Sequence, residues 1–439
     1  MDPIDPLAHI LRVALRGLGL AGYRRAAALS SAELRGMSHI LSYALLMSWW
    51  NRRRSPPDWN EISRRWNEIL AATPGTTVDP TLYGELHPDD RIELVTDNRE
   101  AFAVRARLLP AAKKSIELST YYIQGDEVGA TTVRALVDAA RRGVAVRVLV
   151  DEYVTRKKQF EGLRALTMLD ELQKGGVKVQ AWRDRARPYD AQHRKLLVID
   201  GETVVIGGRN YADHYAGPAW RDTELLLTGP SARDAQAVFD RSWAGAPEPR
   251  DQPGLRFHAT APADEDRNPI FLFLLQSARA ALRTIDIENA YYIMHPSVQE
   301  QLVAARKRGV RVRLFTNSAE STDSEFGNWR FYTSYKQFIE AGGEVYLRLG
   351  RGRTLHSKYF VVDGEWVSLG SINLDYYSPR FCQEVNLQVR SERLGALLTT
   401  WFEGELAEAE HLTDIAKIDA LLPTLGLSRK IDEFMRDMQ

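Results

Sequence analysis

The stretch QHRKLLVIDGETVVIGGRN (192–210) decides the fold, because it recurs as LHSKYFVVDGEWVSLGSIN (355–373). Each copy contains a histidine, a lysine two residues later, an aspartate five residues after that, and an Asp-Gly step. Both copies end in Gly-Gly-x-Asn or Gly-Ser-x-Asn at the same offset. One short motif is weak evidence, but two matching copies indicate a duplicated unit.

The segments before each motif are also duplicated. The first copy predicts strands at 113–123, 144–152, 177–184 and 193–200, with helices at 130–143 and 169–176. The second copy predicts strands at 282–293, 310–317, 344–350 and 356–363, with helices at 298–309 and 335–343. The order β-α-β-α-β-β in both halves predicts an α/β protein with two pseudo-symmetric domains, mixed β-sheets and one shared central site.

Composition shifts divide the chain further. We expect an N-terminal helical segment over 1–80, a first domain over 81–248, a second domain over 262–410 and a C-terminal helical tail over 411–439. AGAPEPRDQPG and ATAPADEDRNP, near 245–268, are rich in Pro, Gly and Asp and predict the boundary between the domains.

The N-terminal segment has two interpretations. Its helices, the third near 58–72, form either a cap on the first domain or an anchor in the membrane interface. Trp49 and Trp50 beside Arg52–Arg54 suit a lipid headgroup boundary.

Composition limits the function classes. Lys+Arg and Asp+Glu both number 58, so the net charge of zero argues against a protein that holds nucleic acid through its phosphates. The single cysteine, Cys382, excludes an intrachain disulfide and is consistent with a reducing compartment. The N-terminus does not resemble a signal peptide, and no stretch has the 18 or so apolar residues that span a bilayer. We expect a cytoplasmic protein at the inner face of the cell membrane.

The motif places an imidazole beside an ammonium group, because residues two apart on a strand face the same way. Pairing the two halves would bring both sets together in one cleft. The candidate catalytic residues are His193, Lys195, Asp200, His356, Lys358 and Asp363. The two aspartates also precede glycine in predicted hairpin turns, where Asp-Gly is favoured for structural reasons alone.

This set fits chemistry at a phosphodiester. Fixed cations stabilise the charge of the transition state, one neutral imidazole attacks phosphorus, and the other serves as acid and then base. Asn210, Asn373 and Ser371 are candidate phosphate-binding residues, although the asparagines could instead cap helices. We expect no metal ion and no cofactor, because no H-E-x-x-H or C-x-x-C motif occurs.

Two further features accompany the motifs. Each histidine is followed by an acid in its own copy, Asp222 and Glu384 respectively, and either acid could accept a ring N–H and orient the imidazole. Tyr121-Tyr122 and Tyr291-Tyr292 end strands at matching places, where they either pack in the core or contact lipid.

The paired motifs resemble the signature of the phospholipase D superfamily over about residues 90–405. Within it, the chain is most similar to bacterial cardiolipin synthases of the C type. The supporting stretches are GGRNYADHY (207–215), FTNSAESTD (315–323), YLRLGRGRTLHSK (346–358) and GSINLDYYSPRFCQEVN (370–386). Two features depart from many members: Gly208 stands where serine is common, and Tyr376-Tyr377 replaces an arginine.

The resemblance implies that His193 is the nucleophile and His356 the acid and base. It also implies synthesis of cardiolipin from phosphatidylglycerol and a second phospholipid, which could be phosphatidylethanolamine. Water as acceptor would instead give a phospholipase D hydrolase. The remaining alternatives are a nuclease and a non-enzymatic lipid-binding scaffold. We expect a monomer with a peripheral membrane surface as partner and no nucleic acid.

Overall fold

The computed structural model describes residues 59–155, 165–185, 187, 190–249, 251–262, 267–293, 295–324, 327–426 and 429. The chain forms two compact units. The larger unit, Ser63–Asp323 with Gln337–Thr413, contains both motifs, and the smaller unit includes the described residues within 324–336 and 414–429. The helices predicted before residue 59, with Trp49 and Trp50, lie outside the described residues.

The first half forms a seven-stranded sheet with the strand order β1-β8-β7-β6-β2-β3-β4. Its strands are β1 (Arg91–Val95), β2 (Ser115–Thr120), β3 (Ala145–Asp151), β4 (Lys178–Trp182), β6 (Leu196–Ile199), β7 (Thr203–Gly207) and β8 (Glu224–Thr228). β2, β3 and β4 pair in parallel, whereas β6, β7 and β8 pair antiparallel. The predicted mixed sheet is confirmed.

The second half repeats this arrangement in a nine-stranded sheet, in which β16-β12-β11-β10-β13-β14-β15-β5 is the order and β9 also pairs with β15. Its strands are β5 (Ala191–Gln192), β9 (Phe257–Thr260), β10 (Thr284–Asn289), β11 (Arg311–Asn317), β12 (Glu344–Arg348), β13 (Lys358–Val362), β14 (Trp366–Gly370), β15 (Cys382–Arg390) and β16 (Glu410–Leu412). β10, β11 and β12 are parallel, and β13, β14 and β15 are antiparallel.

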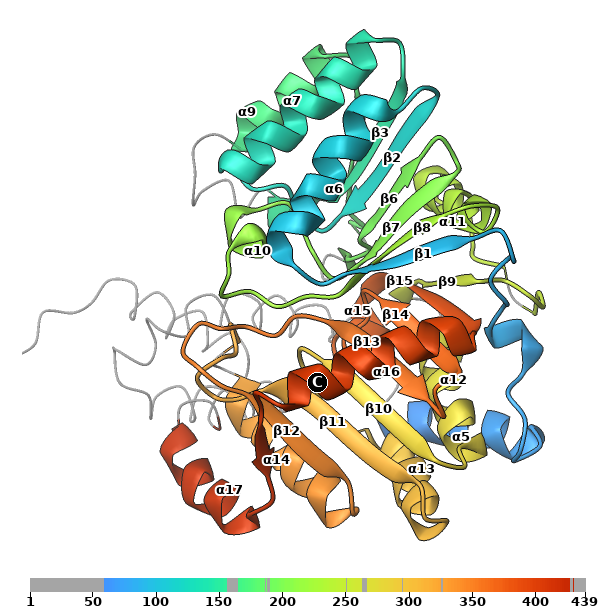
Figure 1. Ribbon diagram of the computed structural model, residues 1–439, viewed down its shortest axis with the longest axis vertical. Coiled ribbons are helices and arrows are strands. Elements are labelled where there is room, and N and C mark those ends of the chain that lie inside the picture. The colour runs from blue at the N-terminus through green and yellow to red at the C-terminus, as the bar shows by residue number, and fades with distance from the viewer. Residues whose placement is uncertain are drawn as a thin grey trace, which may run out of the picture. The chain divides into compact units, whose positions relative to one another are not determined.

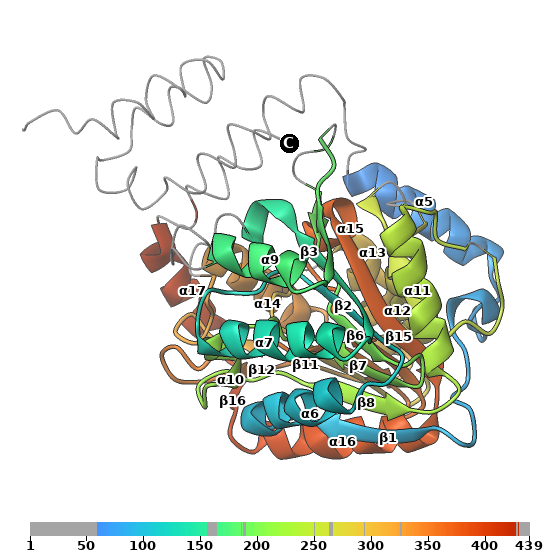
Figure 2. The same ribbon diagram turned by 90° about the horizontal axis from the view of Figure 1, so that it is seen from above.

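Helices cover the outer faces of both sheets. The helices of the described residues are α5 (Trp59–Ala72), η1 (Pro80–Leu82), α6 (Asn98–Ala111), α7 (Glu127–Arg141), α9 (Ala165–Lys174), α10 (Asp213–Ala216), α11 (Ala232–Ala244), α12 (Pro269–Ala280), α13 (Pro296–Lys307), α14 (Asn328–Glu340), α15 (Ser378–Phe381), α16 (Glu392–Leu406), α17 (Ile415–Leu421) and η4 (Leu422–Leu425). Figures 1 and 2 show α6, α7 and α9 together over one face of the first sheet.

The opposite face of the first sheet packs toward the second sheet. One apolar core there contains side chains of β6, β7 and β8, of β13, β14 and β15, and of α11 and α16. Val204 and Val367, for example, are fully buried in this core. The two halves therefore share a core, which fixes the motifs relative to one another.

Local signals explain the helix ends. Asp126 caps α7 by accepting a hydrogen bond from Gly129 N, and the helix ends at Arg141, two residues before Gly143 with φ +90°. The matching helix α13 ends at Lys307, two residues before Gly309 with φ +91°. Glycine adopts this left-handed conformation without a Cβ penalty, so both crossover helices stop where the sequence predicts.

Two predicted segments differ from the structure. The linker near 245–268 contains β9, because the apolar stretch Phe257–Thr260 pairs with β15 and is buried. The predicted helical tail from 411 begins inside β16, which pairs with β12, and becomes helical only at α17 in the smaller unit. Lys336 and Asp419 form an ion pair at 2.6 Å within that unit.

Among the described residues, no helix is long and apolar enough to cross a membrane.

A buried ion pair ties α6 to β8. Arg105 donates to both carboxylate oxygens of Glu224, at 2.9 and 2.6 Å, and both side chains are buried. Arg105→Ala would leave a buried carboxylate with less compensation, so we expect it to lower the free energy of unfolding by about 3–5 kcal/mol. Urea denaturation measures this change.

The matched control lies one half-turn away on the same helix. Arg107 pairs with Glu100 at 2.8 Å, but both side chains are exposed. Arg107→Ala should therefore cost less than about 1 kcal/mol. Equal losses for the two variants would contradict the assignment of Arg105 and Glu224 as a buried structural pair.

Candidate active site

The two motif histidines lie where each half contacts the backbone of the other. His193 follows β5, which pairs in parallel with β15, and its N–H donates to Gln383 O at 3.0 Å. His356 N–H donates to Arg221 O at 2.6 Å. The predicted strand 193–200 begins only at Leu196. His193 lies before this strand, and its backbone N–H bonds β15 of the second sheet.

Each histidine is bonded to a carboxylate from the opposite half. His193 Nδ1 lies 2.8 and 3.0 Å from the two oxygens of Glu384, and His356 Nδ1 lies 2.9 Å from Asp222 Oδ2. The sequence places each acid after the histidine of its own copy, so the structure corrects the pairing. A carboxylate at Nδ1 favours a proton there and leaves Nε2 available for chemistry.

The two lysines point back at their own histidines. Lys195 Nζ donates to His193 O at 2.6 Å, and Lys358 Nζ donates to His356 O. Burial lowers the pKa of Lys195 to about 7, with Lys358 adding to the effect and Glu384 opposing it. Burial also lowers the pKa of Lys358 to about 8, against nearby carboxylates that favour its charged form. A bound anion would favour the charged form of both lysines.

Burial also makes both imidazoles poor proton acceptors in the ligand-free protein. Burial lowers the pKa of His193 well below its usual value, and Lys195 and Lys358 add to this. Burial and then Lys358 lower the pKa of His356 to about 4, although the bond to Asp222 acts in the opposite direction. The side chains of His193 and His356 keep 12% and 7% of their surface exposed, so both remain accessible.

The pKa values of the two acids shift in opposite directions. Burial raises the pKa of Glu384 to about 8 despite the nearby Lys195. Burial also disfavours ionised Asp222, but its hydrogen bond to His356 and neighbouring positive charges outweigh this and lower the pKa of Asp222. Asp222 is therefore the stronger stabiliser of an imidazolium at neutral pH.

Aromatic rings surround the histidines. The Tyr121 ring lies 4.8 Å from the His193 ring, so it contacts the site, whereas Tyr122 and Tyr292 are buried. On the other side, the rings of Trp220, Tyr215 and Tyr291 lie 5.1, 5.5 and 6.3 Å from the ring of His356.

Sequence reasoning missed two of these rings. Tyr215 lies in a quoted stretch that we assigned no role. Trp220 has no counterpart in the repeat, because its place two residues before the acid is taken by Cys382 in the second copy. A duplication signal cannot find a residue that only one copy contains.

The predicted phosphate-binding residues lie at the site, but their polar groups differ in availability. Asn210 Oδ1 accepts from Tyr121 N at 3.2 Å and its Nδ2 donates to Tyr215 OH at 2.7 Å. Asn373 Oδ1 is buried and has no hydrogen-bond partner among the described residues. Neither asparagine caps a helix, because Ala212 and Tyr377 hold the N-cap positions that follow. The helix-cap alternative is therefore wrong.

The side chain of Ser371 bonds Glu384 and is not available to bind a phosphate. Its hydroxyl donates to Glu384 Oε2 at 2.5 Å and accepts from Val385 N at 2.9 Å. The phosphate-binding role predicted for Ser371 is corrected here, since a hydroxyl has only one proton to donate. Ser371 instead holds Glu384 in place.

Gly208 occupies the matching position in the first half. A Cβ there would lie 2.5 and 2.7 Å from the carboxylate oxygens of Asp222, closer than real Cβ atoms approach. Asp222 thus takes the space that a serine side chain would need, which gives a physical reason for this departure from the family pattern.

The motif aspartates lie away from the histidines. Asp200 and Asp363 stand at the far ends of β6 and β13, in turns with φ +57° and +53°. Asp363 accepts hydrogen bonds from the backbone N–H groups of Leu282, Arg283 and Thr284 at 2.7–2.9 Å. Asp200 accepts the equivalent bonds in the first half. The catalytic assignment of both residues is replaced by a structural one.

One group of potential metal ligands occurs in the described part of the chain. Ligand atoms of His193, Cys382 and Glu384 lie within 4.8 Å of one another. His193 and Glu384 already bond each other, burial raises the pKa of the Cys382 thiol, and Lys195 and Lys358 would repel a cation. These residues do not suit a metal ion.

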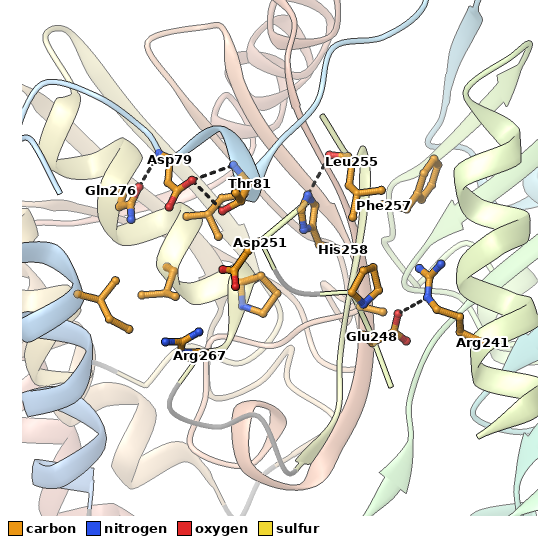
Figure 3. Close-up of a pocket in the computed structure, with 16 residues that line it drawn as sticks. Asp79, Thr81, Arg241, Glu248, Asp251, Leu255, Phe257, His258, Arg267 and Gln276 are labelled. Carbon is orange, nitrogen blue, oxygen red and sulfur yellow. Dashed lines mark hydrogen bonds and ion pairs between the residues drawn. The ribbon is translucent and has the colours of Figure 1, made fainter. Parts of the chain in front are cut away.

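A separate cavity of about 250 Å³ contains none of the motif residues. Figure 3 shows Asp79 and Thr81 of the η1 region, Gln276 of α12 and His258 of β9 around it. Half of its lining residues belong to the segment 245–268 that joins the two halves.

The two halves each contribute a histidine–lysine pair, and these paired motifs are the signature of the phospholipase D class. The chain belongs to the family described as "Cardiolipin synthase, PLD-like domain", whose model matches residues 106–243 and 273–406. The predicted superfamily is thereby confirmed.

Known relatives agree with this assignment. The chain is 29% identical over 353 residues to the "Major cardiolipin synthase ClsA" of Bacillus subtilis (strain 168), which covers 74% of this chain and 70% of the relative. It is 27% identical to a "Cardiolipin synthase" of Staphylococcus aureus (strain Mu50 / ATCC 700699), over 75% and 69%. A "Cardiolipin synthase" of Halalkalibacterium halodurans is 29% identical, and there the chain spans 61% of the relative.

A solved structure supports the fold. The phosphatidylserine synthase of Haemophilus influenzae Rd KW20 superposes with a TM-score of 0.65 at 16% identity, over 85% of this chain and 97% of that one. The predicted phospholipase D fold is confirmed.

The turn assigned to Asp363 is testable. Asp363→Ala removes three acceptor contacts and places alanine at a positive φ, so we expect a loss of roughly 2 kcal/mol in the free energy of unfolding. Turnover per folded molecule should change less than about twofold, because the side chain lies away from both histidines. A loss of turnover comparable to that of His356→Ala, without a loss of stability, would show that Asp363 is catalytic after all.

His258 of the separate cavity makes stability depend on pH. Burial lowers the pKa of His258 to about 4, although its bond to Leu255 O opposes this. Below pH 6.5 the unfolded chain binds a proton that the folded chain does not, so stability falls as the pH falls from 6.5 toward 4. His258→Gln should make this slope shallower by about 1.4 kcal/mol per pH unit, measured by urea denaturation at each pH. The exposed His411→Gln is the control, and equal slopes for both variants would contradict the prediction.

Proposed function

We propose that the protein is a phosphatidyltransferase that makes cardiolipin from phosphatidylglycerol and a second phospholipid through a covalent phosphohistidine. The proposal rests on the bond between each histidine and a carboxylate of the opposite half. These bonds engage Nδ1 and leave the Nε2 atoms of both imidazoles available beside two lysines. The names and extents of the relatives support the choice of cardiolipin. Assignment to the C type of synthase stays a prediction.

The first step is a displacement at phosphorus. His193 Nε2 forms a bond to phosphorus while the bond to the leaving alcohol oxygen breaks, and that oxygen takes a proton from His356. Lys195 and Lys358 stabilise the added negative charge. In the second step the incoming alcohol gives its proton to His356, its oxygen bonds to phosphorus, and the bond to His193 breaks.

The two acids support this division of roles. Ionised Asp222 favours an imidazolium at His356, and the negative charge of a bound phosphodiester favours it further. Glu384, whose pKa burial raises, gives less support to an imidazolium at His193. His193 therefore stays neutral, which is the form that attacks phosphorus.

We further propose that the monomer takes its lipids from the inner face of the cell membrane as a peripheral protein and binds no nucleic acid. Phospholipid donors and acceptors both reside in the bilayer, so the site must open toward a membrane surface. Hydrolysis by water is the competing reaction at the same intermediate.

The two histidine roles can be separated by the leaving group. A phosphodiester with a 4-nitrophenol leaving group needs little protonation, so His356→Asn should still release one equivalent of nitrophenol and then stall. His193→Asn should release none beyond the background. Stopped-flow absorbance measures the burst, and mass spectrometry of the stalled protein locates the phosphoryl adduct.

A matched experiment tests the product. Mixed vesicles of phosphatidylglycerol and phosphatidylethanolamine should yield cardiolipin with the wild type and none with either variant. An adduct on His356, or a burst from His193→Asn, would reverse the assignment of roles. Formation of phosphatidic acid alone would favour the hydrolase.

A further inference from the structure

The stretch FTNSAESTD (315–323) plays no part in the chemistry above, yet it is fixed to the backbone beside one histidine. Asn317, the last residue of β11, donates through Nδ2 to Leu355 O at 2.8 Å and accepts through Oδ1 from Leu355 N at 2.8 Å. Leu355 directly precedes His356. The start of the loop therefore has a set position relative to that imidazole.

Buried hydroxyl groups hold the rest of the loop. Ser321 Oγ donates to Asn317 Oδ1 at 3.0 Å and accepts from Ser318 N at 2.9 Å. Thr354 Oγ1 donates to Ser321 O at 2.8 Å. Ser318, Ser321 and Thr354 are all buried, so these bonds are shielded from water. These bonds fix the conformation of the loop that ends at Asp323.

Asp323 reaches the site through a tyrosine. Tyr291 OH donates to Asp323 Oδ1 at 2.5 Å. The Tyr291 ring lies 6.3 Å from the ring of His356 and 5.8 Å from Lys358 Nζ. Asp323 is exposed, unlike the two acids that bond the histidines.

An exposed carboxylate that bonds neither histidine is unexpected at a site for a phosphodiester, because it repels the phosphate. Asp323 lies close enough to His356 and Lys358 for its charge to favour their protonated forms. Among the described residues, Tyr291 is the hydrogen-bond donor to Asp323, which leaves Oδ2 as an acceptor. A carboxylate in this position fits a ligand that donates a hydrogen bond.

We propose that Asp323 recognises the headgroup of the acceptor lipid, and that this headgroup is a polyol of the glycerol type. The attacking hydroxyl gives its proton to His356, so the acceptor lies on the side of the site where Asp323 lies. The neighbouring hydroxyl of the same headgroup donates to Asp323 Oδ2. This inference rests on the proposed function and adds to it the residue that recognises the acceptor.

Two soluble alcohols isolate this contact. Glycerol has a second hydroxyl beside the attacking one, and ethanol has none. With one donor phospholipid and equal concentrations of both alcohols, mass spectrometry gives the ratio of phosphatidylglycerol to phosphatidylethanol. Asp323→Ala should lower that ratio about tenfold, because one hydrogen bond to a charged group is lost only for glycerol. Asp323→Asn keeps an oxygen acceptor and should lower the ratio less.

Two further variants complete the test. Tyr291→Phe removes the donor that holds Asp323 and should lower the ratio by a smaller factor than Asp323→Ala. Glu320→Ala removes an exposed acid from the same loop and should leave the ratio unchanged.

Equal losses for glycerol and ethanol in Asp323→Ala would overturn the inference, because they would indicate a general role in charge or folding. The same ratio in Asp323→Ala and the wild type would also overturn it. Transfer to neither alcohol by the wild type would contradict the proposed function itself, and this outcome is distinguishable because it needs no variant.

Discussion

The site depends on the exchange of carboxylates between the halves. Asp222 of the first half bonds His356, and Glu384 of the second half bonds His193. Both acids are fully buried, so loss of either bond within the folded protein would leave a buried carboxylate without its histidine partner. Leaving a buried charge uncompensated is costly. The catalytic geometry and the contact between the halves are therefore stabilised by the same two hydrogen bonds, and neither half holds a complete set of groups.

The backbone makes this exchange possible. The short strand β5 leaves its own half to pair with β15, and Arg221 accepts a hydrogen bond from His356 N. A single apolar core contains side chains of β6 to β8 and of β13 to β15. This core fixes the contact of β5 with β15 and the contact of His356 with Arg221. Close packing of this kind resists small shifts, and a displacement of about 1 Å at a reacting atom can cost roughly a hundredfold in rate.

Local patterns predicted most of the fold, because strand and helix signals depend on nearby residues. The duplicated β-α-β units and the mixed sheets follow from such signals. The pairing of Glu384 with His193 does not follow from local signals, because the two residues belong to opposite halves of the chain. Asp200 shows a second limit. Its spacing in the motif suggested a catalytic role, but it bonds three backbone N–H groups at the end of β6 that lies away from His193. The spacing of residues along a strand predicts which face of the sheet a side chain lies on. It does not predict which residues from other parts of the chain contact that side chain.

The two halves have diverged where the reaction requires different behaviour. Ser371 donates to Glu384, whereas its counterpart Gly208 leaves Asp222 without a hydroxyl donor and close to His356. Cys382 stands where the first half has Trp220, so the aromatic rings gather around His356 and not equally around both histidines.

A symmetric site would give both imidazoles the same pKa, and neither would be favoured as acid or nucleophile. The paired acids differ in the direction of their pKa shifts, which supports the two different roles proposed for the histidines. Asp323 bonds Tyr291 beside His356, the residue that takes up the proton of the incoming alcohol in the proposed mechanism. Under the proposed function, acceptor recognition can therefore change without a change in the duplicated histidines and lysines, because Asp323 is not part of either motif.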